Sequence, residues 1–379
     1  MSTHGTGGHT AEREPSPLGS LLDIFQVRAY FNTALLARDL AAGIPSDARF
    51  VRAILRSMTS GELVPPRQDP FPGRAAPGPA GGPRIAVVAT GGSGAMASVL
   101  GALRACEEAG VRPSVISMAS GAALFGLPFA AGRTAAEVAR FTLGLRPRDY
   151  IDWDWRSLTR SAIRGGRGFG GFLAGRRLEE AYLGFLGHRT LGDLDLPAYV
   201  PVWNVEESRL EYLGPRTHPN LTVARAVRMA VAMPLLFDPV RFQGGDWCDG
   251  GIVDILPVRP VLDLEPLSEA ALVVNCFYPP RFAGEPARGW RSHALSILGL
   301  AEQVRSAQHL ELARDNLERL ARSMPVVEIQ PVHHRVVRGV GLYHQFLDTS
   351  EWAGFMRAGR ARARPALRRL LRQASSVAA

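Results

Sequence analysis

RIAVVATGGSGAMASVLGALRACEEAG, residues 84–110, is the stretch that decides the fold. Its first part, 84–89, is a continuous apolar run without polar alternation, which is typical of a parallel strand covered by helices on both sheet faces. A glycine-rich loop follows. Residues 94–109 then repeat apolar side chains at helical spacing, with Gly110 as a C-cap signal. The stretch therefore predicts a strand, a tight loop and a helix.

The rest of the chain continues this alternation. SVISM at 114–118 predicts the next strand and a helix begins near Ser120, so the order β-α-β-α implies a parallel pair with a right-handed crossover. We expect a strand pair within 199–213, a strand or strand end at 251–256, strands at 271–277 and 326–332, and helices within 133–190, 223–233 and 291–323. The pattern predicts an α/β fold, a three-layer α/β/α sandwich with a mostly parallel central sheet.

Composition divides the chain into five parts. We expect a disordered tail at 1–18, a helical N-terminal appendage at 19–60, a Pro/Gly linker at 61–83, a catalytic domain at 84–350 and a basic C-terminal helical segment at 351–379. The tail is polar and rich in glycine, proline and histidine. The linker contains too many prolines for a helix or a central strand.

The charge is carried by arginine alone. Of the 379 residues, 46% are hydrophobic, and the net charge is +9 although the chain contains no lysine. We interpret the missing lysine, together with abundant alanine and glycine, as the codon bias of a high-GC bacterial genome. The arginines are scattered and lack interleaved aromatic residues, so nucleic acid is not an expected partner. Such a charge favours an anionic lipid surface instead.

The chain shows no sign of secretion or of a membrane span. Its three cysteines are odd in number and widely separated, which argues against a disulfide framework and against a thiolate metal site. The N-terminus lacks the apolar core of a signal peptide, and no apolar run approaches the roughly 20 residues that span a bilayer. We expect a cytoplasmic protein, at most peripheral to the membrane. The stretch from Trp352 to Arg372 mixes apolar residues with arginines, which suits either a lipid-surface helix or a helix packed on the core.

Ser120 is the candidate nucleophile. It stands where a predicted strand ends and a helix begins, and Gly121 beside it relieves crowding of the backbone. Such a turn projects a hydroxyl above the sheet, near the positive end of the helix, where an oxyanion is favoured. The alternative is that Ser120 is an ordinary helix N-cap.

The loop of Gly91, Gly92, Ser93 and Gly94 is the candidate oxyanion hole. Three glycines in four residues allow backbone N–H groups to turn toward one point beside the sheet. A strand, a glycine-rich loop and a helix also begin a dinucleotide-binding unit. That alternative is disfavoured because the spacing is not G-x-G-x-x-G and no acidic residue closes a following strand.

Asp249 is the candidate base. It precedes Gly250 and Gly251, and a partly buried carboxylate there can accept the serine proton if burial raises its pKa toward neutrality. The alternative is a simple Asp-Gly turn. A histidine base also stays open, because the order Ser, Asp, His is that of an α/β-hydrolase triad. The histidines that follow Asp249 in suitable order are His333, His334 and His344.

These motifs together resemble the patatin-like phospholipase family over roughly residues 84–350. The most specific part of the resemblance is AVRMAVAMPLLFDPV (226–240) followed by DGGIVDILPV (249–258). The family's helix after the glycine loop corresponds to SVLGAL (98–103), and its G-x-S-x-G elbow falls on MASGA (118–122). The resemblance implies a Ser120–Asp249 dyad, two-step acyl transfer on lipid or other acyl esters, and neither metal nor organic cofactor.

The chain departs from the family pattern at five positions. The elbow glycines are Met118 and Ala122, the arginine and glycine of the oxyanion loop are Ala95 and Met96, and the asparagine of N-x-P is Ile255. Three functions therefore stay open: a serine lipid acyl hydrolase, an acyltransferase of the same fold, and a catalytically silent lipid- or partner-binding protein.

Overall fold

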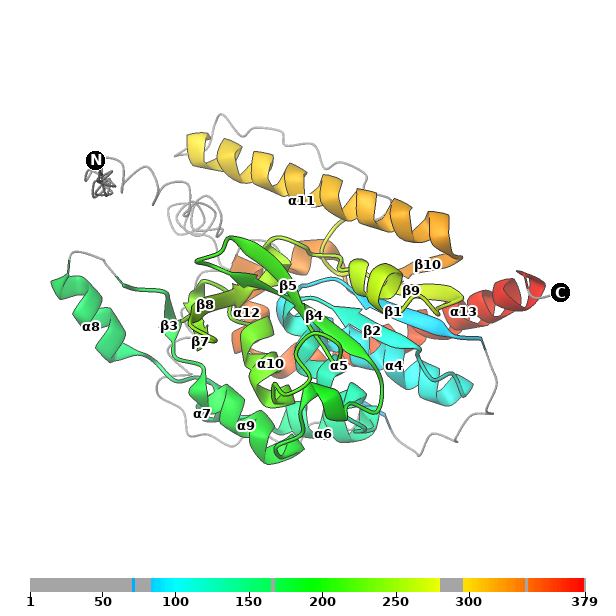
Figure 1. Cartoon of the computed structure of the whole chain (residues 1–379), viewed down its shortest axis with the longest axis horizontal. Coiled ribbons are helices and arrows are strands. Elements are labelled where there is room, and N and C mark those ends of the chain that lie inside the picture. Colours follow the sequence, from blue (N-terminus) through cyan, green and yellow to red (C-terminus); the bar gives the residue numbers. More distant parts are fainter. Residues whose placement is uncertain (1–69, 72–82, 165–167, 280–295, 338–339, 378–379) are drawn as a thin grey trace, which may run out of the picture.

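The computed structural model describes residues 70–71, 83–164, 168–279, 296–337 and 340–377 (Figure 1). The expected tail, the N-terminal appendage and nearly all of the linker lie outside these residues. Within the described part, the fold is the expected α/β fold.

The core of the molecule is one mixed sheet with the strand order β10-β9-β1-β2-β4-β8-β7, in which β5 pairs with β4. The first five strands of this order run parallel to one another, whereas β8, β7 and β5 are antiparallel to their neighbours. The strands are β1 (Ile85–Ala89), β2 (Val115–Met118), β4 (Ala198–Asn204), β5 (Arg209–Leu213), β7 (Val240–Phe242), β8 (Gly245–Asp249), β9 (Ala270–Val274) and β10 (Val326–Ile329). A separate two-stranded sheet joins β3 (Gly171–Leu173) to β6 (Leu235–Phe237).

Helices cover both faces of the main sheet, as the unbroken apolar run of β1 predicts. Ile85, Val87 and Ala89 lie in one hydrophobic core, and Ala86 and Val88 lie in the other. Figure 1 shows α11 on one side of the sheet and α4, α5 and α6 on the other. The helices are α4 (Ala97–Ala109), α5 (Ala123–Ala130), α6 (Ala135–Gly144), α7 (Pro147–Tyr150), α8 (Trp155–Ile163), α9 (Arg176–Leu186), α10 (Val223–Ala230), α11 (Ser296–Ser323), α12 (Val340–Leu347) and α13 (Trp352–Val377).

One predicted strand is wrong. Residues 251–256 are not a strand, because the strand is β8, which ends at Asp249, and a 3-10 turn follows at Gly250–Ile252. The Asp249 side chain accepts a hydrogen bond from the N–H of Gly251 and caps this turn. The capped Asp-Gly-Gly turn therefore ends β8, and the apolar residues after it do not form a new strand.

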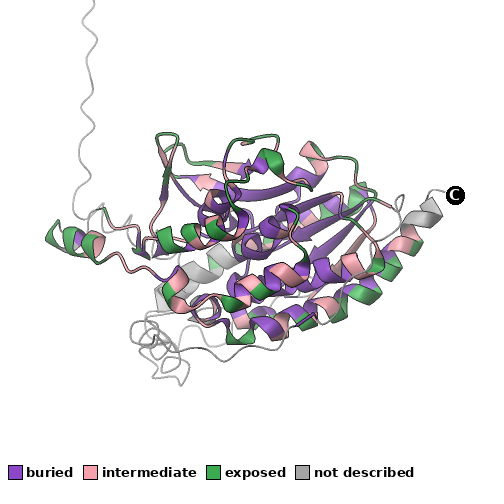
Figure 2. Ribbon diagram, turned by 90° about the horizontal axis from the view of Figure 1, so that it is seen from below, coloured by how far each residue is buried: buried purple, intermediate pink, exposed green. Residues whose placement is uncertain are grey.

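Helix α13 belongs to the core. Its apolar side chains Met356, Leu367 and Leu370 are at most 1% exposed, and Figure 2 shows its inner side buried and its outer side exposed. Of the two alternatives for this segment, the structure shows the helix packed on the core, because its apolar face is buried against the protein. Two glycines allow the close approach to α4: a Cβ on Gly101 would lie 1.9 Å from the Met356 carbonyl oxygen, and one on Gly359 would lie 1.9 Å from that of Ser98.

Candidate active site

Ser120 lies at a strained turn between a strand and a helix. Strand β2 ends at Met118, Ala119 is extended, and a 3-10 turn from Ser120 to Ala122 leads into α5. Ser120 has φ +51°, a left-handed conformation that costs a non-glycine residue about 1–3 kcal/mol. The N-cap of the turn is Ala119, without a side-chain cap, so Ser120 is not an N-cap serine.

Asp249 is held beside Ser120 at the end of β8. Its N–H donates to the carbonyl of Ala232 at 3.0 Å. Its carboxylate is buried and accepts a hydrogen bond at 2.7 Å from the Gly251 N–H. The Ser120 side chain lies beside it, since a Cβ on Gly251 would lie 3.0 Å from the Asp249 Oδ1 and 3.3 Å from the Ser120 Cβ. Gly250 lets the chain pass β4, since a Cβ there would lie 2.4 Å from the carbonyl carbon of Pro201. The structure therefore brings together the two side chains that the sequence analysis paired.

Burial raises the pKa of Asp249 from 3.8 to about 7, while the hydrogen bonds from Ser120 and Gly251 act in the opposite direction. A carboxylate in water would be a weak base at neutral pH. With a pKa near 7, Asp249 is strong enough to share the proton of a serine hydroxyl and still ionised in a large fraction of molecules.

The glycine-rich loop lies against the elbow, and its first residue, Gly91, is engaged in the fold. Its N–H donates to the carbonyl of Ile255 at 3.2 Å, so it is already used. What Gly91 provides is space: a Cβ there would lie 3.2 Å from the Ser120 Cβ. This hydrogen bond disfavours Gly91 as an oxyanion donor.

The other loop residues remain available as donors. Gly92 and Ser93 have φ +147° and +52°, and a 3-10 turn begins at Ser93. The first N–H groups of such a turn have no partner within the turn. The N–H groups of Ser93 and Gly94 are therefore free of hydrogen bonds inside the turn and can point to a ligand. The Ser93 hydroxyl is buried and has no hydrogen-bond partner in the part of the chain that the structure describes. Gly94 also allows close packing, because a Cβ there would lie 2.0 Å from the carbonyl oxygen of Gln345.

Sequence reasoning missed a buried network behind Asp249. The Asp254 carboxylate accepts from the Tyr212 hydroxyl at 2.6 Å and from the Asn316 amide at 3.0 Å. The Asp254 N–H donates to the Gly250 carbonyl at 2.9 Å. The network ties the turn after Asp249 to β5 and α11. No local signal marks it, because its members are far apart in sequence.

Residues 87–262 match the family model described as patatin-like phospholipase. The chain therefore contains a patatin-like phospholipase region over these residues. This patatin-like chain is 26% identical over 214 residues to a protein named lysophospholipase NTE1 of Mycosarcoma maydis. The alignment covers 55% of this chain and 11% of that protein, so the chain spans only a small part of this relative's length.

Two solved structures that the chain matches are VipD and a human phospholipase A2. VipD from Legionella pneumophila has a TM-score of 0.45 and 16% identity, and covers 83% of this chain and 72% of that one. Human GIVD cytosolic phospholipase A2 in complex with methyl gamma-linolenyl fluorophosphonate has a TM-score of 0.41 and 11% identity, and covers 90% of this chain and 64% of that one.

The departures from the patatin-like pattern do not distort the site. Met118 and Met96 are fully buried and lie in the hydrophobic core. Neither Met118 nor Ala122 has a positive φ, so neither position needs glycine for its backbone. Ala95 is also buried, and the Ile255 side chain packs beneath Gly91.

The histidine alternative receives no support from the site's geometry. His344 lies on α12 and pairs with Asp348 at 3.8 Å, and His334 stacks on His333 with ring centroids 4.4 Å apart. The groups that act on the pKa of Asp249 are its own burial, Ser120 and Gly251, and no histidine is among them.

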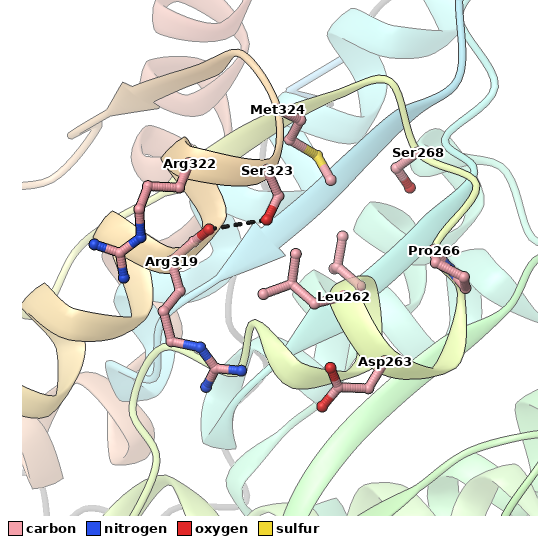
Figure 3. A pocket seen from close by; sticks show the side chains of 9 residues that line it. Leu262, Asp263, Pro266, Ser268, Arg319, Arg322, Ser323 and Met324 are labelled. Carbon is pink, nitrogen blue, oxygen red and sulfur yellow. Dashed lines mark hydrogen bonds between the residues drawn. The ribbon is translucent and has the colours of Figure 1, made fainter.

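A pocket of about 550 Å³ lies at the other end of the sheet (Figure 3). Figure 3 shows Arg319 and Asp263 on opposite sides of it. Ser268 and Met324, which also line it, lie just before the starts of β9 and β10 in sequence. The pocket is therefore at the amino ends of the parallel strands, whereas Ser120 is at a carboxyl end, where α/β sheets bind ligands.

Proposed function

We propose that the protein is a serine lipid acyl hydrolase in which Ser120 is the nucleophile and Asp249 is the base. The observation that carries the proposal is the position of the Ser120 side chain beside the buried Asp249 carboxylate, whose pKa is raised by burial to about 7. The family implies lipid ester substrates. The elbow strain at Ser120 also supports the proposal, because such strain persists where function requires it.

The first step forms an acyl-enzyme. Asp249 accepts the proton of Ser120 as the oxygen attacks the ester carbonyl, and the carbonyl π electrons move onto its oxygen. The N–H groups of Gly92, Ser93 and Gly94 are the proposed donors to that oxyanion. The oxyanion collapses, the C–O bond to the alcohol breaks, and the proton on Asp249 passes to the leaving alcohol.

The second step releases the acyl group. Asp249 removes a proton from a water molecule, whose oxygen attacks the acyl carbonyl, and the second oxyanion collapses to a carboxylic acid. The proton then returns from Asp249 to Ser120. An acyltransferase would use an acceptor alcohol in place of water, with the same residues.

Covalent labelling tests the proposal. A fluorophosphonate probe should label the wild-type protein and fail to label Ser120→Ala. Ser114→Ala is the matched control, because Ser114 bonds to the hydroxyl of Ser268 and lies before β2; it should be labelled like wild type. Labelling of Ser120→Ala at the wild-type rate, or a folded wild-type protein that takes up no probe, would refute a Ser120 nucleophile.

Acyl products distinguish the hydrolase from the alternatives. The wild-type protein, given a lipid ester and glycerol in water, should release mainly free fatty acid. Predominant transfer to the added alcohol would favour the acyltransferase. Lipid binding without any turnover would favour the silent protein.

A further inference from the structure

Helix α8 carries an exposed apolar face at one end of the molecule. Figures 1 and 2 show the helix standing apart from the main sheet, with most of its surface exposed. Trp155 is 53% exposed, Ile163 is 82% exposed, and Phe172 on the neighbouring strand β3 is 43% exposed. Large apolar side chains are rarely left in water as a group unless they bind something. We call these three residues, together with the arginines of α8, the α8 surface.

The α8 surface is preformed. Trp155 stacks on Trp153 with ring centroids 5.8 Å apart, and Phe172 meets Phe169 edge-to-face at 5.0 Å. The backbone holds helix and strand together, because the Asp154 N–H donates to the Phe172 carbonyl at 2.9 Å. The aromatic side chains are therefore fixed in place before anything binds, which lowers the entropic cost of binding.

The same helix carries an unneutralised positive charge. Arg156 and Arg160 on α8 and Arg164 directly after it recur every four residues and share one side, and no acidic residue lies between 155 and 164. Within the described ranges, none of the three pairs with a carboxylate. The arginines of α13 differ in this respect, since Arg360 and Arg364 both pair with Glu108. Arginine beside exposed tryptophan and phenylalanine is the composition of a helix that lies in a membrane interface.

The α8 surface is connected to the candidate active site. Strand β3, which holds α8 in place, pairs with β6 through Leu173 and Phe237. The segment just before β6 contains Ala232, whose carbonyl accepts the Asp249 N–H. A bilayer against α8 would therefore lie at the end of the sheet that holds Ser120.

We infer that the α8 surface docks the protein on an anionic lipid surface, with its aromatic side chains among the acyl chains and its arginines against the phosphates. The purpose of the docking, delivery of lipid esters to Ser120, rests on the proposed function. The docking itself does not. A second copy of the chain, or another part of the same chain, would be a different occupant, and the experiments below separate these outcomes.

Vesicle binding tests the charge. The full chain should co-sediment with phosphatidylcholine vesicles that contain phosphatidylglycerol, and much less with phosphatidylcholine alone. The triple variant Arg156→Gln/Arg160→Gln/Arg164→Gln should lose about tenfold or more of its partition coefficient, since each arginine near an anionic surface contributes substantially. No binding by the wild-type protein, or equal binding to both vesicles, would overturn the inference.

A matched variant on α13 controls for net charge. Arg357, Arg362 and Arg369 are exposed on that helix, and changing all three to glutamine removes the same charge from another surface. This variant should bind vesicles within about threefold of wild type, because its arginines lie away from the docking face. An equal loss in both variants would mean that overall charge, and not α8, governs binding, and would overturn the inference.

A fluorescent label tests the apolar face. The native cysteines Cys106, Cys248 and Cys276 are all buried, so Ile163→Cys can be labelled selectively with an environment-sensitive dye. Its emission should shift to the blue on anionic vesicles. The same label on Leu267→Cys, a residue 61% exposed near the amino end of β9, should not shift. A dye at 163 that is already blue-shifted without vesicles, or that shifts on dimerisation, would assign the surface to protein and overturn the inference.

Two substrates separate this inference from the proposed function. The α8 triple-arginine variant should hydrolyse a water-soluble ester at the wild-type rate and vesicle lipid more slowly. If the wild-type protein hydrolyses neither, the proposed function fails, while the vesicle-binding result still decides the docking. Unchanged hydrolysis of vesicle lipid by the variant would overturn the inference while leaving the hydrolase intact.

Discussion

Gly121 packs so closely on Ser93 that a Cβ at position 121 would lie 2.3 Å from the Ser93 carbonyl oxygen. The contact joins the elbow that carries the candidate nucleophile to the loop that carries the proposed oxyanion donors. Because backbone meets backbone, neither side can give way by rotating a side chain. The distance between the Ser120 hydroxyl and the loop therefore depends on the absence of one methyl group.

Gly121→Ala should lower kcat by about 100-fold, since a displacement of about 1 Å costs that much in a preorganised site. Steady-state kinetics on a soluble ester, with circular dichroism to check folding, measures this. Gly184→Ala is the control, because a Cβ there on α9 meets nothing within 4 Å; it should keep its activity and gain up to about 1 kcal/mol of stability. Equal activity in the two variants would show that the contact does not position the site.

The activity of the wild-type protein should depend on the ionisation of Asp249. Only the carboxylate can accept the serine proton, and burial raises its pKa to about 7. We expect kcat/KM to rise with pH and to level off above an apparent pKa of about 7. A profile measured from about pH 5 to pH 9 that is flat, or that falls with rising pH, would contradict a carboxylate base.

The same pKa shift predicts that Asp249 weakens the fold at high pH. The folded-state pKa of about 7 lies above the ordinary value of 3.8, so the stabilisation is complete below about pH 4 and is lost as the pH rises through 7. Asp249→Asn removes the charge, and should be more stable than wild type at about pH 8, by up to about 4 kcal/mol, with no gain near pH 4. Urea denaturation at the two pH values measures the difference, and a gain independent of pH would contradict the prediction.

Restoring the family's glycine at position 118 should not improve the enzyme. Met118 is fully buried, and Met118→Gly would open a cavity costing about 2–5 kcal/mol in the free energy of unfolding. Turnover per folded molecule should stay at the wild-type level, because the side chain points into the core. Met118→Leu should cost less than about 1.5 kcal/mol. A large increase in kcat for Met118→Gly would show that the methionine crowds Ser120.

Local patterns predicted the elements that depend on neighbouring residues. The run Ile85–Ala89 is apolar on both faces, and the strand it predicted separates two cores. Gly110 ends α4 in a left-handed conformation with φ 69°, as its C-cap signal indicated. Order and spacing also placed Ser120 and Asp249 at the ends of strands, and the structure brings the two side chains together.

The sequence could not settle what distant parts of the chain decide. The N–H of Gly91 is used by Ile255, 164 residues later, which no local pattern could indicate. The sequence left a lipid-surface helix and a packed helix open for α13, because the residues on which it packs lie far away on α4. Asp254 carried no signal because Tyr212 and Asn316 reach it from β5 and α11.

The contact between α4 and α13 also sets the order of events during synthesis. Residues 97–109 and 352–377 pack together through Gly101 and Gly359, so the face of the sheet beneath them stays open until nearly all of the described chain has left the ribosome. Contacts at such separation form slowly. A nascent chain would thus expose β9 and β10 to chaperones and to neighbouring chains until α13 arrives.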